Sequence, residues 1–99
     1  MSKSGAAYPG LTAPFSLAGR RLRNRLVHAS ISTQLAENAR VSARLIQYHV
    51  SRARGGAGMI VAEPLGMVRR FDVPRRVRAW NDDDLDGLCR WQAPGASPI

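Results

Sequence analysis

A strand, a helix and a second strand follow one another in the middle of this chain, and this pattern constrains the fold more than any other feature. Residues 26–29 form a short apolar run, and residues 58–62 form a second one. Between them, apolar residues recur at the spacing of one helix face, at Leu45, Ile46, His49, Val50 and Ala53. A continuous apolar run after a helix is typical of a parallel strand buried on both faces. The sequence therefore predicts a right-handed βαβ unit.

The ends of this helix carry recognisable boundary residues. Ser42 is a good N-cap, because its hydroxyl can accept a hydrogen bond from an amide of the first turn. Arg52 and Arg54 lie in the last turn, where the helix dipole favours cations. Gly55 can adopt the left-handed conformation that follows many helices. The glycines of residues 55–58 thus close a helix and lead into a strand, which is the reverse of a dinucleotide-binding loop.

Two further elements are expected outside the βαβ unit. Apolar and polar residues alternate in Phe15-Ser16-Leu17 and Leu22-Arg23-Asn24, so a short hairpin is predicted around residues 18–20. A second helix is predicted to start near Asn81-Asp82-Asp83-Asp84, because acids favour the first turn, and these acids are expected to be solvated. The apolar edge of this helix consists of Leu85, Leu88 and Trp91.

The composition excludes several classes of protein. The single cysteine, Cys89, excludes an internal disulfide framework and a cysteine-rich metal site. His28 and His49 lack further ligands in a metal-binding pattern, and we expect them to pack on a strand and a helix. No stretch approaches the roughly 18 apolar residues of a membrane span, and the N-terminus lacks the pattern of a secretory signal. A cytoplasmic location is expected.

The chain is strongly basic, and its charge leaves two interpretations open. Fourteen arginines and one lysine stand against seven acids, which gives a net charge of +8. Five of the arginines gather in the loop expected at residues 64–80, namely Arg69, Arg70, Arg75, Arg76 and Arg78. One interpretation is a small nucleic-acid-binding protein that uses this loop. The other is that the balancing acids belong to a C-terminal part beyond Ile99.

Four short motifs occur along the chain at a distinctive spacing: Pro14-Phe15-Ser16-Leu17, Leu22-Arg23-Asn24-Arg25-Leu26-Val27, Arg52-Ala53-Arg54-Gly55-Gly56-Ala57-Gly58 and Trp80-Asn81-Asp82-Asp83. Their order and spacing resemble the N-terminal part of the old yellow enzyme / NADH:flavin oxidoreductase family, which includes FMN-dependent ene-reductases and dienoyl-CoA reductase-like enzymes. The resemblance runs from about Tyr8 to about Trp91. It implies an α/β fold that is an incomplete TIM (β/α)8 barrel, made of an N-terminal hairpin, the first βαβ unit and the start of a second crossover helix.

A complete barrel of this kind needs about 250 residues. The resemblance therefore implies that residues 1–99 are a partial FMN-binding TIM-barrel domain, with a divergent tail at residues 92–99. Barrel enzymes build their sites on the loops at the carboxyl ends of the strands.

In the family, the segment after the first strand packs its backbone beside the flavin ring. The matching positions are Ala29, Ser30, Ile31 and Ser32, and the end of the second strand adds Glu63 and Pro64. A flat ring needs close backbone approach, amide donors near its N5 and O4 edge, and an apolar wall. Small and apolar residues at these positions meet that need. The alternative for all six positions is plain barrel packing.

Three positions depart from the family pattern. Ser30 replaces Pro, Ile31 replaces Met, and Ala39 replaces the Gly of a turn in the first loop. If residue 39 needs a positive φ angle, an alanine there is strained. As a flavin neighbour, the Ser32 hydroxyl could tune the reduction potential by bonding near O4; otherwise it caps the loop.

The resemblance implies an oxidoreductase that passes a hydride from NAD(P)H through FMN to an electron-poor alkene. A small molecule is the expected substrate, and neither a membrane nor a nucleic acid is an expected partner. The family's substrate-gripping pair, its proton-donating tyrosine and its phosphate-binding residues match positions beyond Ile99. No catalytic residue is therefore assigned within the chain, which is expected to be an N-terminal fragment, inactive alone. A small basic nucleic-acid-binding protein and a non-catalytic remnant are the alternatives.

Overall fold

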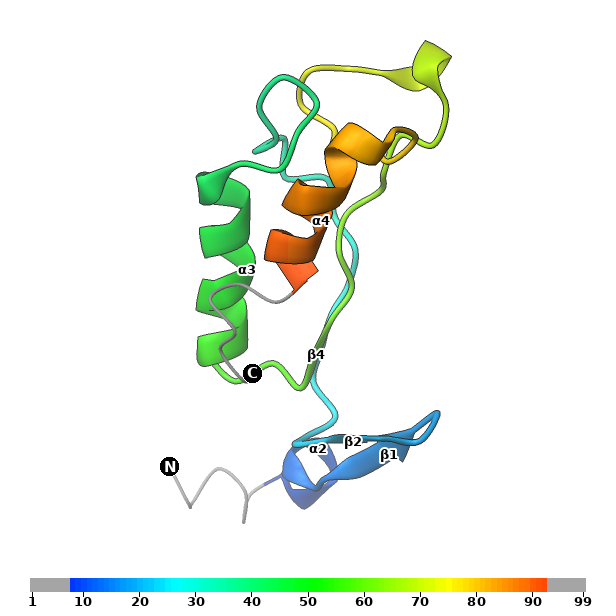
Figure 1. Ribbon diagram of the computed structural model, residues 1–99. Coiled ribbons are helices and arrows are strands. Elements are labelled where there is room, and N and C mark those ends of the chain that lie inside the picture. The colour runs from blue at the N-terminus through cyan, green and yellow to red at the C-terminus, as the bar shows by residue number, and fades with distance from the viewer. Residues whose placement is uncertain (1–7, 93–99) are drawn as a thin grey trace.

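The structure, a computed structural model, describes residues 8–92. Its elements in chain order are helix α2 (Pro9–Thr12), strands β1 (Phe15–Leu17), β2 (Arg20–Leu22) and β3 (Val27–His28), helix α3 (Ala43–Arg54), strand β4 (Met59–Ile60), 3-10 turns at Arg69–Phe71 and Asp82–Asp84, and helix α4 (Leu85–Gln92). Strand β1 pairs with β2 antiparallel, and β3 pairs with β4 parallel. This is a small α/β fold in which residues 8–92 close no barrel (Figure 1).

The predicted βαβ unit is confirmed, with short strands. Val27 lies opposite Met59 and His28 lies opposite Ile60. The Val61 amide extends the pairing by donating to the His28 carbonyl oxygen at 3.0 Å. The regular strands are shorter than the apolar runs at 26–29 and 58–62, because a two-stranded sheet supports each strand along one edge only.

Helix α3 begins where the sequence predicted. The hydroxyl of Ser42 accepts a hydrogen bond from the Leu45 amide at 3.0 Å and donates one to the Leu35 carbonyl oxygen at 2.6 Å. The buried residues of the helix are Leu45, His49, Val50 and Ala53, which are members of the predicted apolar face. This face packs against β4 and α4.

The end of α3 differs from the prediction by one residue. Gly55 has a φ angle of −74° and stays right-handed, because its amide still donates to the Ser51 carbonyl oxygen at 2.9 Å. Gly56 takes the positive φ angle instead, at 122°. The prediction of a left-handed Gly55 is therefore wrong.

The segment before β3 holds the junction between α3 and β4. Asn24 Nδ2 donates to the Gly56 carbonyl oxygen at 2.6 Å, and Arg23 Nη2 donates to the Ala57 carbonyl oxygen at 3.0 Å. Gly58 passes so close to this segment that a Cβ atom on it would lie 2.6 Å from the Asn24 carbonyl oxygen. The junction therefore requires glycine at residue 58 for reasons of space.

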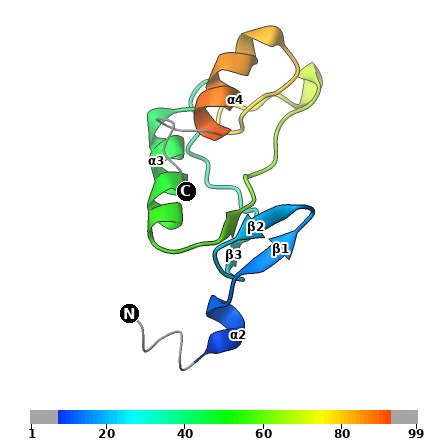
Figure 2. The same ribbon diagram turned by 60° about the horizontal axis from the view of Figure 1, so that its bottom comes forward.

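The predicted hairpin is also confirmed, and its second strand begins earlier than expected. Ala18 and Gly19 form a two-residue turn with φ angles of 50° and 79°, the conformation that suits the twist of two paired strands. Because the turn is this short, β2 starts at Arg20, where the sequence analysis placed the turn. The hairpin and α2 lie at one end of the molecule, away from α4 (Figures 1 and 2).

The two long loops that follow β3 and β4 are joined by backbone hydrogen bonds. The Ala39 amide donates to the Pro74 carbonyl oxygen at 2.9 Å, and the Arg78 amide donates to the Ala39 carbonyl oxygen at 2.9 Å. Asn38 and Ala39 have φ angles of 54° and 61°. The sequence analysis expected strain at residue 39 if its φ angle is positive. The angle is positive, so the alanine there is strained.

The core lies between α3, α4 and these loops. Its buried cluster contains Ala36, Leu45 and Val77, and Leu88 and Trp91 of α4 pack against it. Leu85, by contrast, is 60% exposed. The prediction for Leu85 is wrong because Asp84, and not Leu85, is the buried residue where this helix begins.

Among the helices of residues 8–92, none has the length and apolar character that a bilayer span requires. The divergent tail predicted at 92–99 lies, apart from Gln92, outside the described residues.

Candidate functional site

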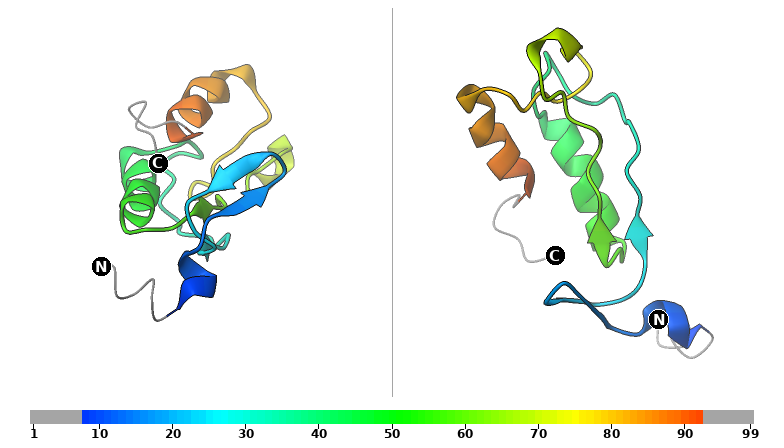
Figure 3. Two further views of the ribbon diagram at one scale, coloured as in Figure 1. Left: turned by 90° about the horizontal axis from the view of Figure 1, so that it is seen from below. Right: turned by 90° about the vertical axis from the view of Figure 1, so that its right-hand side faces the viewer.

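The carboxyl ends of β3 and β4 bring the predicted flavin positions together. The segments that follow the two strands continue in the same direction (Figure 3, right), and Ser30 Oγ donates across them to the Ala62 carbonyl oxygen at 2.8 Å. We call residues 29–32 and 62–64 the strand-end strip. Five of the six predicted positions in it are exposed: Ala29, Ser30, Ile31, Ser32 and Pro64. The strip therefore has the position that barrel enzymes use for their sites.

Glu63 differs from the other five positions because its side chain is buried. It is 3% exposed, and its carboxylate accepts a hydrogen bond from Thr33 Oγ1 at 2.5 Å. The same Thr33 oxygen accepts a hydrogen bond from the Leu35 amide at 3.3 Å. The carboxylate therefore joins the two loops inside the fold, and Glu63 adds no exposed surface to the strip.

Thr33 is a site residue that the sequence analysis missed. The sequence gives one indication of it. Thr33 stands directly after Ser32, just as Glu63 stands directly after the second apolar run at residues 58–62. A hydroxyl in that place can bind a carboxylate that would otherwise be buried without a partner.

The strip also offers backbone donors. Within residues 8–92, the amides of Ser30, Ile31 and Ser32 find no hydrogen-bond acceptor. The Ile31 side chain beside them is 52% exposed. Unpaired N–H donors next to an exposed apolar side chain are what the ring of a flavin requires, so these residues fit the ring side of FMN.

Four ring side chains form a cluster next to the strip, which we call the ring cluster. His28 comes from β3, Tyr48 and His49 come from α3, and Trp91 comes from α4. The ring centroids are 5.0 Å apart for Tyr48 and His49, 5.6 Å for His28 and Tyr48, and 5.5 Å for His49 and Trp91. His28 Nε2 lies 3.1 Å from the Tyr48 hydroxyl, and Trp91 Nε1 donates to His49 Nδ1 at 2.9 Å. Both histidines pack as predicted, on a strand and a helix.

His49 has a perturbed protonation equilibrium. It is buried, and burial lowers its pKa below the ordinary value. The neighbouring His28 lowers this pKa further, Glu63 raises it, and Arg52 lowers it. In the part of the chain that the structure describes, no group of three or more His, Cys, Asp or Glu side chains could hold a metal ion.

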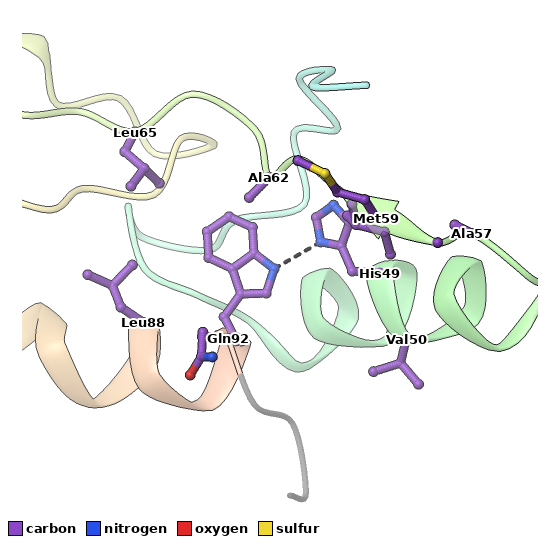
Figure 4. A pocket seen from close by; sticks show the side chains of 11 residues that line it. His49, Val50, Ala57, Met59, Ala62, Leu65, Leu88 and Gln92 are labelled. Atoms are coloured by element: carbon purple, nitrogen blue, oxygen red, sulfur yellow. Dashed lines mark hydrogen bonds between the residues drawn. The ribbon is translucent and has the colours of Figure 1, made fainter. Parts of the chain in front are cut away.

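An apolar groove of about 440 Å³ lies between α3, β4 and α4 (Figure 4). Its walls include Val50, Met59, Leu65 and Leu88, and His49 is one of the few polar groups that line it. Ala62 lines the groove too, and its carbonyl oxygen receives the hydrogen bond from Ser30. The groove and the strand-end strip therefore meet at this residue.

The acids before α4 are not uniformly solvated. Arg78 Nε donates to Asp84 Oδ1 at 2.6 Å, Arg40 Nη1 lies 3.7 Å from the same oxygen, and Asp84 is 6% exposed. Burial alone would raise the pKa of Asp84, but the hydrogen bond and charge of Arg78 lower this pKa overall. The same hydrogen bond raises the pKa of Arg78. The prediction of a solvated acid is therefore wrong for Asp84, because the loop before α4 folds back onto the helix start.

The arginines of residues 69–78 bear on the nucleic-acid interpretation. Arg78 is paired with Asp84, and Arg75 Nη1 donates to the Gln34 carbonyl oxygen at 3.3 Å. These two cations therefore have partners within the chain. It remains a prediction that residues 69–78 do not bind a nucleic acid.

No protein-family model matches the chain. The curated proteins that are similar in sequence include an NADH oxidase and a metal reductase. An NADH oxidase of Thermoanaerobacter brockii is 44% identical over 57 residues, which are 57% of this chain and 9% of that protein. A metal reductase of Desulforamulus reducens is 32% identical over 93 residues, which are 90% of this chain and 14% of that protein. The chain therefore spans between 9% and 14% of the length of these relatives.

The fold is similar to part of a solved structure, a variant of NCR from Zymomonas mobilis. The TM-score is 0.71 at 23% sequence identity, and the match covers 80% of this chain and 26% of that one. This likeness concerns the fold and adds no function by itself. Taken with the two sequence matches, it shows that the chain is a relative of the old yellow enzyme / NADH:flavin oxidoreductase family and covers the N-terminal region of its members.

Proposed function

We propose that this chain forms the ring-side wall of the FMN site in an NAD(P)H-dependent oxidoreductase of the alkene-reducing type. The observation that supports it most is the strand-end strip, in which two segments separated by 32 residues meet through the hydrogen bond from Ser30 to Ala62. The proposal treats the fold as the opening part of a TIM (β/α)8 barrel, with its hairpin, its first βαβ unit and the start of its second crossover helix.

Several residues in and beside the strip have a physical role in this proposal. Ala29 is small and allows the backbone to approach a flat ring, and Ile31 forms the apolar wall. The amides of residues 30–32 are the donors for the polar edge of the ring. Thr33 holds Glu63, which keeps the second segment beside the first. When bound, FMN supplies the hydride transfer between a reduced nicotinamide and an electron-poor alkene.

The resemblance assigns the phosphate-binding and substrate-gripping residues to later parts of family members. Ring contacts alone leave the phosphate of FMN without a partner. We therefore expect the 99-residue chain by itself to be colourless and to show no turnover of an activated alkene.

A chimera tests the proposal. Residues 8–92 replace the matching segment of the Zymomonas mobilis NCR variant, and bound flavin is measured by absorbance after purification. We expect about one FMN per chain, and we expect Ile31→Asp to weaken flavin binding about tenfold or more, because an unpaired carboxylate is then buried against the ring. The matched control is Val73→Asp, since Val73 is 42% exposed in the loop after β4.

Two outcomes would count against the proposal. One is a folded chimera that binds no flavin, which favours a non-catalytic remnant. The other is equal flavin content in the Ile31→Asp and Val73→Asp chimeras. The 99-residue chain alone serves as the negative sample, and stoichiometric yellow protein there would show that residues 1–99 suffice for binding.

A further inference from the structure

The ring cluster joins α4 to α3 through a hydrogen bond that depends on protonation. Trp91 Nε1 donates to His49 Nδ1 at 2.9 Å, the dashed line at His49 in Figure 4. An indole N–H can only donate, so Nδ1 of His49 must be unprotonated and the ring hydrogen must be on Nε2. The bond therefore exists only while His49 is neutral.

The surroundings of His49 make a positive charge on it costly. The charged and titratable groups that face it are His28 on β3, Tyr48 and Arg52 on α3, and Glu63 after β4. The rings of His28 and His49 are 5.8 Å apart, and His28 Nδ1 is buried with no hydrogen-bond partner within residues 8–92. Glu63 is the one acid among these groups, and its carboxylate is already bonded to Thr33.

We propose that the charge of His49 controls how α4 is attached and, through it, how far the apolar groove is open. With His49 neutral, Trp91 is bonded, and Leu88 and Trp91 pack against the core. With His49 protonated, Nδ1 becomes a donor that faces the indole N–H, so two hydrogen-bond donors oppose each other where one bond stood. The carboxyl end of α4 then leaves α3 and uncovers the apolar wall formed by Val50 and Met59.

The direction of the pH dependence follows from the environment. Burial and the neighbouring His28 lower the pKa of His49 from its ordinary value of 6.5. The stabilisation that neutral His49 gives is therefore complete above pH 6.5 and is lost as the pH falls through the lower pKa of the folded chain. This proposal does not depend on flavin binding.

Trp91 reports on the contact directly. In a Trp80→Phe background, Trp91 is the remaining tryptophan, and its emission is recorded from pH 8 to pH 4.5 together with far-UV circular dichroism. We expect emission at short wavelength at pH 8 and a shift to longer wavelength with a midpoint below 6.5, while α3 keeps most of the helical signal. His49→Gln is the matched control, because the glutamine carbonyl oxygen can accept the indole hydrogen bond and does not titrate in this range.

The variants at His49 and His28 show whether the emission shift comes from protonation of His49. We expect the His49→Gln protein to show no shift over this pH range. We expect His28→Gln to keep the shift with a higher midpoint, since one repelling ring is gone. A shift that persists unchanged in His49→Gln overturns the proposal. Trp91 emission that is already solvent-like at pH 8 overturns it as well, because the bond is then not formed.

Discussion

At the scale of single residues, close backbone approach decides which side chains are tolerated. A Cβ atom on Gly58 would lie only 2.6 Å from the carbonyl oxygen of Asn24, and the side chain of Asn24 is bonded to the Gly56 carbonyl oxygen. Asn24 Oδ1 also accepts a hydrogen bond from the Leu26 amide at 3.0 Å. Asn24 therefore cannot move away from residue 58 without losing contacts on two sides.

Gly58→Ala is expected to destabilise the chain by about 1–3 kcal/mol, because the added methyl group overpacks a site that cannot relax. Gly10→Ala is the matched control, since a Cβ at Gly10 meets nothing within 4 Å. The free energy of unfolding is measured by urea titration followed by circular dichroism. Equal effects of the two substitutions would show that Asn24 does not restrict residue 58.

At the scale of elements, the start of α4 depends on one buried carboxylate. Asp84 Oδ2 accepts a hydrogen bond from the Asn81 amide at 3.2 Å, while Asn81 Oδ1 accepts one from the Asp83 amide at 2.9 Å. Asp84 Oδ1 accepts from Arg78 in the preceding loop. The same side chain therefore caps the helix start and fixes the loop before it.

Asp84→Asn is expected to lower the melting temperature at pH 7 by several degrees, because the amide keeps the shape but loses the charge that pairs with Arg78. The pKa of Asp84 is lowered from its ordinary value of 3.8, so its contribution is present above that value and is lost as the pH falls through the lower pKa of the folded chain. The difference between the two proteins should thus shrink in acid. Asp82→Asn, at an exposed acid of the same turn, is the control, and an equal loss there would contradict the assignment.

At the scale of the whole molecule, apolar surface stays exposed around the parallel strand pair. Val27 and Ile31 are each 52% exposed, and Val61 is 39% exposed. Within residues 8–92, β3 and β4 each pair along one edge only. Grouped apolar side chains next to free strand edges are a surface to which other apolar molecules or strands bind.

This surface should be detectable with a dye that fluoresces on apolar protein. We expect the chain to enhance the emission of such a dye, and we expect Val27→Thr with Val61→Thr to reduce it, because threonine has a similar shape with a polar group. Val73→Thr is the control at a comparably exposed valine in the loop after β4. If the double variant and this control give the same emission, the dye binds elsewhere.

The sequence predicted the elements whose causes are local. Helix α3 follows from the spacing of Leu45, His49 and Val50 and from the hydroxyl of Ser42, all within one segment. The strand-end strip was predictable as well, because parallel strands place their carboxyl ends at the same edge.

Side-chain contacts between distant segments were not predictable. Thr33 with Glu63 and His49 with Trp91 are 30 and 42 residues apart in sequence. A periodic pattern shows that such residues face inward, but it does not name the partner. The choice between Gly55 and Gly56 for the positive φ angle has a similar cause, since Asn24 bonds the Gly56 carbonyl oxygen from outside the helix.

The hydrogen bond between Ser30 and Ala62 has a consequence for the order in which the chain folds. It closes a loop of 32 residues, whereas the bonds of α3 close single turns. Local contacts form in well under a millisecond, and contacts across long loops form later because more chain entropy is lost. The helix thus precedes the strip in time, and the surface proposed to meet the flavin assembles together with the pairing of β3 and β4, which closes loops of the same length.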